Sequence, residues 1–178
     1  EDFARLVPKG LLRENMERAL EIYRDRLQPF FFEAALDRGY FQGLVSRVEA
    51  LKSEDRQIVA PMVYQEVDTF HMMLVARGRF NYGMTPEILL PLHIAGARVP
   101  LALFAAMLND QDVFTSAGRV LQRVLDTVPS GQEQDAAPMA VYASTLEKFA
   151  WKRFLRLSNT AFRQSHMGFG AIVGYTGL

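Results

Sequence analysis

The sequence lacks cysteine entirely among its 178 residues, and it contains one tryptophan and three histidines. The absence of cysteine excludes disulfides, thiolate metal sites and a cysteine nucleophile. An excess of charge of either sign is also missing, because 20 basic residues balance 20 acidic ones. A basic field over the whole surface, typical of many nucleic-acid-binding proteins, is therefore not expected.

Hydrophobic residues make up 49% of the chain and charged residues 22%, which is the balance of a folded domain and excludes a disordered tail. The most apolar stretch, residues 88–108, reaches the length of about 20 residues that spans a membrane. It contains Arg98 and two prolines, so we expect two short buried helices and no transmembrane segment. The chain begins at Glu1 without a leader-like segment and stops inside an apolar run, so we expect a fragment.

Apolar residues spaced three and four apart predict helices along almost the whole chain. Ser53 is expected to cap one helix that stops at Gly78, and Thr85 followed by Pro86 marks the start of the next. The alternation that marks strands is absent, so the predicted fold class is all-α. The expected helices cover residues 11–28, 30–37, 53–78, 86–90, 99–109, 111–127 and 141–163, and a last segment begins near residue 168.

One polar stretch rich in proline and glycine, residues 129–135, is the best candidate for a linker. We therefore expect a helical domain over residues 1–127, a linker over 128–140 and the truncated start of another domain over 141–178. Leu20-Glu21 is echoed by Leu146-Glu147, 126 residues later, and further weak matches follow in the same order. This order indicates a repeating helical unit.

Motifs that carry enzyme chemistry are missing. No phosphate-binding loop and no nucleophile elbow occurs, and the glycines at Gly168 and Gly170 are too few for a dinucleotide fingerprint. His71 follows Asp68 by three residues, but a di-iron site needs two such pairs and two more glutamates. We predict a solvated or core-edge His71 and no catalytic, cofactor or metal site. A small helical enzyme with a metal at His71 remains the alternative.

Glu66 falls within an apolar helical stripe, where an ionised carboxylate loses its hydration. Buried charges are normally paired, so we expect Glu66 to be buried and bonded to an arginine, either Arg77, Arg79 or one on a neighbouring helix. The alternative is a site for a partner's cation.

Several motifs in a fixed order resemble the C-type subunit of the bacterial and archaeal A/V-type ATPases, whose counterpart in the eukaryotic vacuolar enzyme is the d-type subunit. The resemblance runs from about residue 20 to residue 178. Its motifs are Glu66-Val67-Asp68, Arg77-Gly78-Arg79, Tyr82-Gly83-Met84-Thr85-Pro86-Glu87, the turn at Gly96, and Gly168-Phe169-Gly170 followed by Tyr175.

The resemblance implies an all-helical, funnel-shaped protein of three similar domains, of which this chain would hold about one and a third. It implies a non-catalytic rotor subunit without cofactors, which joins the central stalk to the membrane rotor ring, peripheral to the membrane on its cytoplasmic side. The residues that it marks are Glu66, Asp68, Arg77, Gly78, Tyr82, Gly83, Pro86, Glu87, Gly96, Gly168, Gly170 and Tyr175.

A free-standing helical module that binds a peptide or an apolar ligand is the alternative function. If the chain is a fragment, the last helices lack their normal cover. Either the long helix folds back on the preceding domain, or the tail swings out on its linker and two chains pair through apolar side chains of the tail, which is the outcome we favour. The side chains concerned are Trp151, Phe154, Leu155, Phe162, Phe169, Ile172 and Val173.

Overall fold

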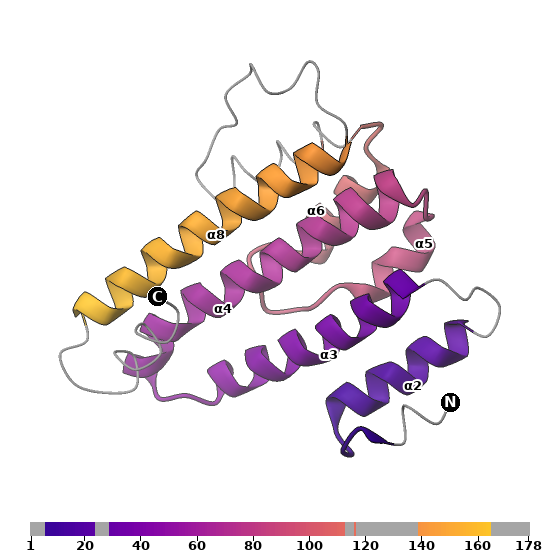
Figure 1. Cartoon of the computed structure of the whole chain (residues 1–178). Helices are drawn as coiled ribbons and strands as arrows, with labels where there is room; N and C mark the ends of the chain where they lie inside the picture. The colour runs from indigo at the N-terminus through magenta and orange to yellow at the C-terminus, as the bar shows by residue number, and fades with distance from the viewer. Residues whose placement is uncertain (1–5, 24–28, 113–115, 117–138, 165–178) are drawn as a thin grey trace.

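The computed structural model describes residues 6–23, 29–112, 116 and 139–164, and this part of the chain is all-α. Four helices lie side by side in the order α8, α4, α3 and α2, as Figure 1 shows. Their bounds are Leu11–Tyr23 for α2, Pro29–Glu49 for α3, Ser53–Met73 for α4 and Met139–Gln164 for α8.

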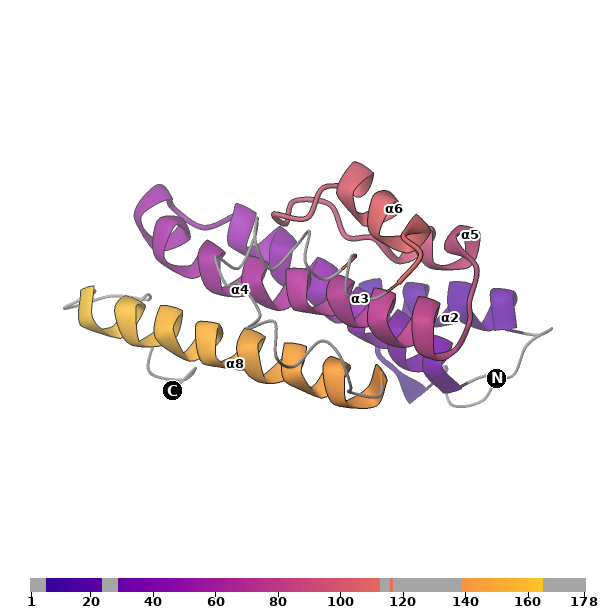
Figure 2. The ribbon, with the colours of Figure 1, turned by 90° about the horizontal axis from the view of Figure 1, so that it is seen from above.

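Helix α4 continues directly into a short π-helix, and further short elements then cross one side of this layer. The π-helix is η1 (Leu74–Asn81), and the crossing elements are α5 (Pro86–Leu89), the 3-10 turn η2 (Leu90–Leu92) and α6 (Leu101–Asn109). In Figure 2, α5 and α6 lie on one side of α3 and α4, and α8 lies on the other side of α4. Helix α4 is therefore the central element, with neighbours on both sides.

The main core forms where α3, α4, η1 and α6 meet. Val67, Leu89, Phe104 and Leu108 are fully buried there. Fully burying an aliphatic or aromatic side chain is worth about 1.5–3 kcal/mol, so the burial of these four side chains strongly stabilises the fold.

The C-terminal end predicted for the second helix is wrong. We expected residues 30–37, but α3 continues through Gly39 to Glu49. Val45 and Val48 are buried on its extended part. A glycine inside a helix costs about 1 kcal/mol, which the burial of two valines outweighs.

The third predicted helix also differs at both ends. Ser53 is the first helical residue and not the cap, because Lys52 precedes the helix and no side chain caps it. Pro61 lies inside α4, and the helical path does not stop at Gly78 but continues as η1 to Asn81. The start at Pro86 and the predicted helices at 99–109 and 141–163 are confirmed to within two residues.

The prediction that the tail swings out is wrong for α8, the helix of the tail. Helix α8 packs along α4, with Ser158 and Ala161 buried in the contact. Trp151 and Phe162 nevertheless stay exposed, so pairing of two chains through them remains a prediction. The linker 129–135, the last segment from residue 168 and nearly all of the predicted helix 111–127 lie outside the described residues. Among the described helices, none has both the length and the hydrophobicity that crossing a bilayer requires.

Candidate functional site

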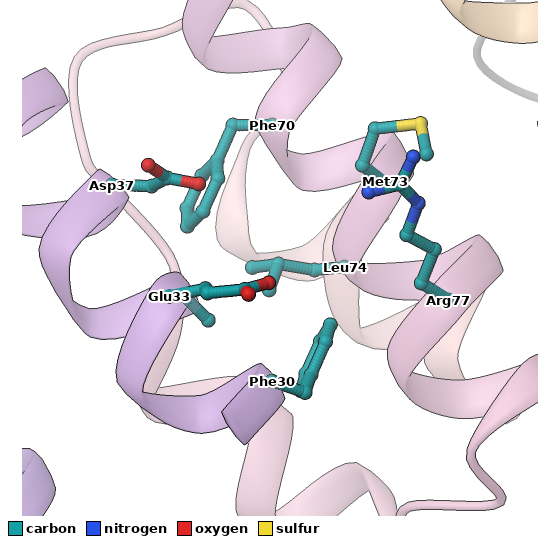
Figure 3. A pocket seen from close by; sticks show the side chains of 8 residues that line it. Phe30, Glu33, Asp37, Phe70, Met73, Leu74 and Arg77 are labelled. Carbon is teal, nitrogen blue, oxygen red and sulfur yellow. The ribbon is translucent and has the colours of Figure 1, made fainter. Parts of the chain in front are cut away.

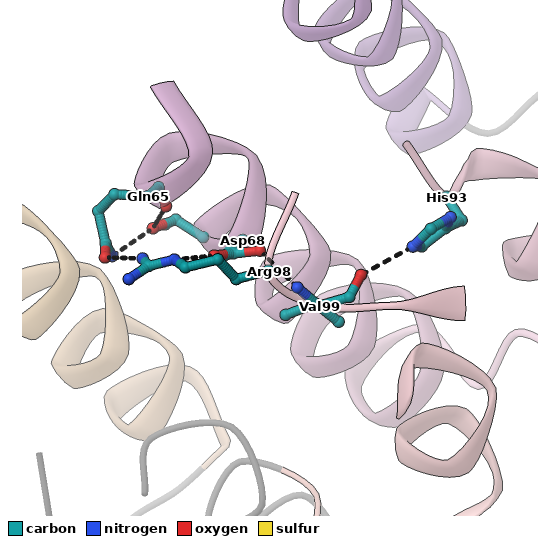
Figure 4. Close-up of polar contacts among 6 residues, drawn as sticks. Gln65, Asp68, His93, Arg98 and Val99 are labelled. Carbon is teal, nitrogen blue, oxygen red and sulfur yellow. Dashed lines mark hydrogen bonds and ion pairs between the residues drawn. The ribbon is translucent and has the colours of Figure 1, made fainter. Parts of the chain in front are cut away.

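The segment between η2 and α6 is held to α4 by a set of buried polar contacts, shown in part in Figure 4. We call this set the polar clamp. It consists of Gln65, Asp68 and His71 on α4, and His93, Ile94, Arg98 and Val99 on the segment. Residues three apart lie on one face of a helix, so Gln65, Asp68 and His71 all point toward the segment.

Asp68 is the centre of the clamp, with its side chain fully buried. Its Oδ1 accepts the backbone N–H of Val99 at 2.9 Å, and its Oδ2 accepts Nε–H of Arg98 at 3.0 Å. Burial raises the pKa of the Asp68 carboxyl, while the Val99 N–H and the Arg98 guanidinium act against this rise. The two donors and the opposite charge are what allow a carboxylate to remain at this depth.

The guanidinium of Arg98 bridges two side chains of α4. Its Nη2 donates to Oε1 of Gln65 at 2.7 Å, while its Nε is bonded to Asp68. Gln65 is itself fully buried, and its amide lies 3.5 Å from the hydroxyl of Thr69. A planar guanidinium has its donors in fixed positions, so these bonds set the orientation of the segment as well as its distance from α4.

His71 continues the clamp one turn further along α4. It is fully buried, and its Nε2 accepts the backbone N–H of Ile94 at 3.0 Å. An accepting Nε2 requires the neutral ring with its proton on Nδ1. Burial, and next the nearby His93, lower the pKa of His71 to about 3. The prediction of a solvated or core-edge histidine was therefore wrong.

His93 closes the clamp from the other side. Its Nε2 donates to the carbonyl of Val99 at 2.9 Å, and both imidazoles lie beside the ring of Phe104. The histidines thus fix backbone groups of the segment. Within the described part of the chain, no group of three or more His, Asp or Glu residues is placed to hold a metal ion.

A second packed cluster joins η1 to α3, α5 and α6. A Cβ on Gly78 would lie 2.8 Å from Cδ2 of Leu89 and 3.0 Å from Cζ of Phe30, so any larger residue forces the buried Leu89 side chain to shift. Arg79 donates from Nε to the carbonyl of Leu108 at 3.1 Å, at the C-terminal end of α6 where a positive charge is favourable.

A small pocket opens between α3 and the joint of α4 and η1 (Figure 3). It has an empty volume of about 330 Å³, which includes space open to solvent. Glu33 and Asp37 point into it from α3, and burial, then Glu33, raise the pKa of Asp37. The lining residues are Phe30, Glu33, Ala34, Asp37, Phe70, Met73, Leu74 and Arg77.

The residues marked by the family motifs fall into separate places. Asp68 belongs to the polar clamp, whereas Arg77 lines the pocket and Gly78 lies in the cluster at η1. The exposed ring of Tyr82 lies 5.1 Å from that of Phe30.

The remaining marked residues shape turns or helix starts. Gly83 and Gly96 have φ of 65° and 94°, in the left-handed region that favours glycine. Pro86 is the first residue of α5 and Glu87 is exposed beside it. Gly168, Gly170 and Tyr175 lie outside the described residues.

The arginine partner predicted for Glu66 is not found among the described residues. Glu66 is half-buried, and burial raises its pKa, but within the described residues it forms no ion pair with an arginine. The fully buried acid that pairs with an arginine is Asp68, two positions further along. Two residues correspond to about 200° of helix, so Asp68 faces the segment and Glu66 cannot.

Sequence reasoning also missed Gln65, His93 and Arg98 as members of the site. Arg98 lies 30 residues from Asp68 along the chain, and no local spacing connects them. The available signal was indirect: one arginine stands in the otherwise apolar stretch 88–108 and needs a carboxylate nearby.

Comparison with known proteins identifies the family of this chain. Neither the search of curated proteins nor that of solved structures gave a match. The family model described as the ATP synthase (C/AC39) subunit matches residues 1–178. The all-α fold agrees with the resemblance noted from the motifs. The chain therefore belongs to the ATP synthase (C/AC39) subunit family, a non-catalytic part of the A/V-type rotary ATPases.

Proposed function

We propose that this chain couples the central stalk to the membrane rotor ring of an A/V-type ATPase, in ATP-driven ion transport or ATP synthesis. Membership of the family supports a place in the complex. The observation that carries the mechanical part is the bonding of Asp68 to Arg98 and Val99, which ties a connecting segment to the central helix.

Transmission of torque requires a body that does not deform between its two contacts. Close-packed interiors resist deformation, and here the core joins α3, α4 and α6. The segment between η2 and α6 has no helical hydrogen bonds of its own between His93 and Pro100, so it would be the compliant part. The polar clamp removes this compliance, because a load on α6 passes through Arg98 and Val99 to α4.

The partners in this proposal are the central-stalk subunits on one side and the polar loops of the rotor ring on the other. The chain would be peripheral, on the cytoplasmic side of the membrane. We also propose the division into a helical domain over residues 1–127, a linker over 128–140 and the start of a further domain over 141–178.

The direct test is coupling in a reconstituted A/V-type ATPase from which this component has been left out. Adding the chain is expected to restore ion transport per ATP hydrolysed, and Asp68→Asn to restore less of it. Glu66→Gln is the matched control, because it removes a carboxylate from the same helix without touching the clamp. Failure of the chain to bind purified stalk subunits in calorimetry would contradict the proposal.

A further inference from the structure

Helix α8 carries two parallel stripes of different chemistry. Trp151, Leu155 and Phe162 follow one spacing, and Lys152, Arg156 and Arg163 repeat the same spacing one position later. Successive residues of a helix are about 100° apart, so the basic stripe runs alongside the apolar one over about 18 Å.

The packing of α8 fixes where the two stripes lie. Ser158 and Ala161 are buried on the side that contacts α4. The apolar stripe lies within about 60° of Ser158 around the helix, at the edge of that side, whereas the basic stripe points away from α4. Trp151 is 55% exposed and Phe162 45%, and the side chains of Lys152, Arg156 and Arg163 are exposed as well. Trp151 also stacks on Phe154, with ring centroids 5.6 Å apart, so its indole has a fixed place on the surface.

The charge of this face is of one sign. Residues 148–164 include five basic side chains and no acidic one, although the chain as a whole is neutral. A solvated helix face usually mixes both signs, which favours solubility without a directed field. An unmixed basic stripe beside exposed aromatic rings instead attracts an extended anionic surface.

We propose that the exposed edge of α8 formed by these two stripes docks on the surface of an anionic lipid bilayer. Lys and Arg bind lipid phosphates there, and aromatic side chains enter the boundary between headgroups and acyl chains. Charge alone would also suit an acidic protein, but Trp151 and Phe162 beside the basic stripe match the layered chemistry of a membrane surface. This contact goes beyond the proposed function, which involves only protein partners.

The chain provides its own reporter, because Trp151 is its single tryptophan and lies on the proposed contact. On mixing with vesicles of phosphatidylcholine and phosphatidylglycerol, we expect a blue shift of its emission and quenching by brominated lipids. Vesicles of phosphatidylcholine alone should give neither change. High salt should weaken the binding, because the attraction is screened.

The decisive variant is Lys152→Gln/Arg156→Gln/Arg163→Gln, which keeps good helix formers. Each basic residue near an anionic membrane contributes about a factor of five to binding, so the vesicle partition coefficient should fall roughly a hundredfold. The control Arg47→Gln/Lys52→Gln/Arg56→Gln removes three exposed charges from the α3–α4 end and should bind nearly as well as the original chain. Equal melting temperatures show that all three proteins are folded.

Three outcomes would overturn the proposal: equal binding to vesicles without phosphatidylglycerol, an equal loss in both triple variants, or a Trp151 shift with single-stranded RNA but not with vesicles. The vesicle assay contains no other protein. Its result is therefore independent of whether the chain binds stalk subunits.

Discussion

The imidazole rings of His71 and His93 lie face to face, with centroids 4.6 Å apart and planes inclined by 8°. The two rings fix different backbone groups of one segment, the N–H of Ile94 and the carbonyl of Val99. Protonation of His71 would remove the Nε2 lone pair that accepts the N–H of Ile94. It would also place a positive charge against the stacked ring of His93. The stack therefore requires a neutral His71.

This requirement predicts loss of stability in acid. The pKa of His71 is about 3 in the folded chain and about 6.5 when unfolded, so its neutral form is the stabilised one. The contribution is fully present above pH 6.5 and is lost as the pH falls toward 3. At pH 5 the loss is about 2 kcal/mol relative to pH 8. Denaturant unfolding between pH 8 and pH 5 should show this loss of unfolding free energy for the original chain, and a much smaller loss for His71→Asn.

Asp68→Ala is expected to destabilise the fold by about 3–5 kcal/mol, because it leaves the Arg98 charge and the Val99 N–H without their acceptor. Glu66→Gln, on the same helix, should change stability by less than about 1 kcal/mol, since no arginine in the described part of the chain is paired with Glu66. Urea unfolding of both variants tests the assignment. A larger loss for Glu66→Gln would contradict it.

Gly78→Ala should cost about 1–3 kcal/mol, because the new methyl group would overlap Leu89 and Phe30. Gly43→Ala is the natural comparison. A Cβ at Gly43 would meet nothing within 4 Å, and alanine favours the interior of α3, so we expect a gain of about 0.5–1 kcal/mol. Thermal melts of the two variants should shift in opposite directions.

Glu33→Gln should relieve the charge repulsion between Glu33 and Asp37 in the pocket between α3 and η1. Glu33 and Asp37 are one turn apart, and Glu33 adds to the rise in the pKa of Asp37 that burial causes. The variant is expected to lower the pKa of Asp37 and to raise stability by about 0.2–0.5 kcal/mol. NMR titration of the Asp37 carboxyl measures the first effect, with Glu54→Gln on α4 as the control that leaves it unchanged.

The sequence by itself determined the helical class, several helix bounds and the family. Periodic apolar spacing is a local property, and so is the start at Pro86, which fixes its own φ. The order of short motifs is also a property of the linear chain, which is why the resemblance to the rotary ATPases is visible without the fold.

Tertiary structure decided which polar residues act together. Glu66 and Asp68 are both acidic residues of one helix, but Arg98 and Val99, 30 and 31 residues further along the chain, contact only Asp68. Tertiary contacts also decided the length of α3. The helix continues past Gly39 because the burial of Val45 and Val48 in the core outweighs the cost of a glycine inside a helix. Ion pairs and core packing depend on contacts between segments far apart in the chain, and local spacing contains no information about those contacts.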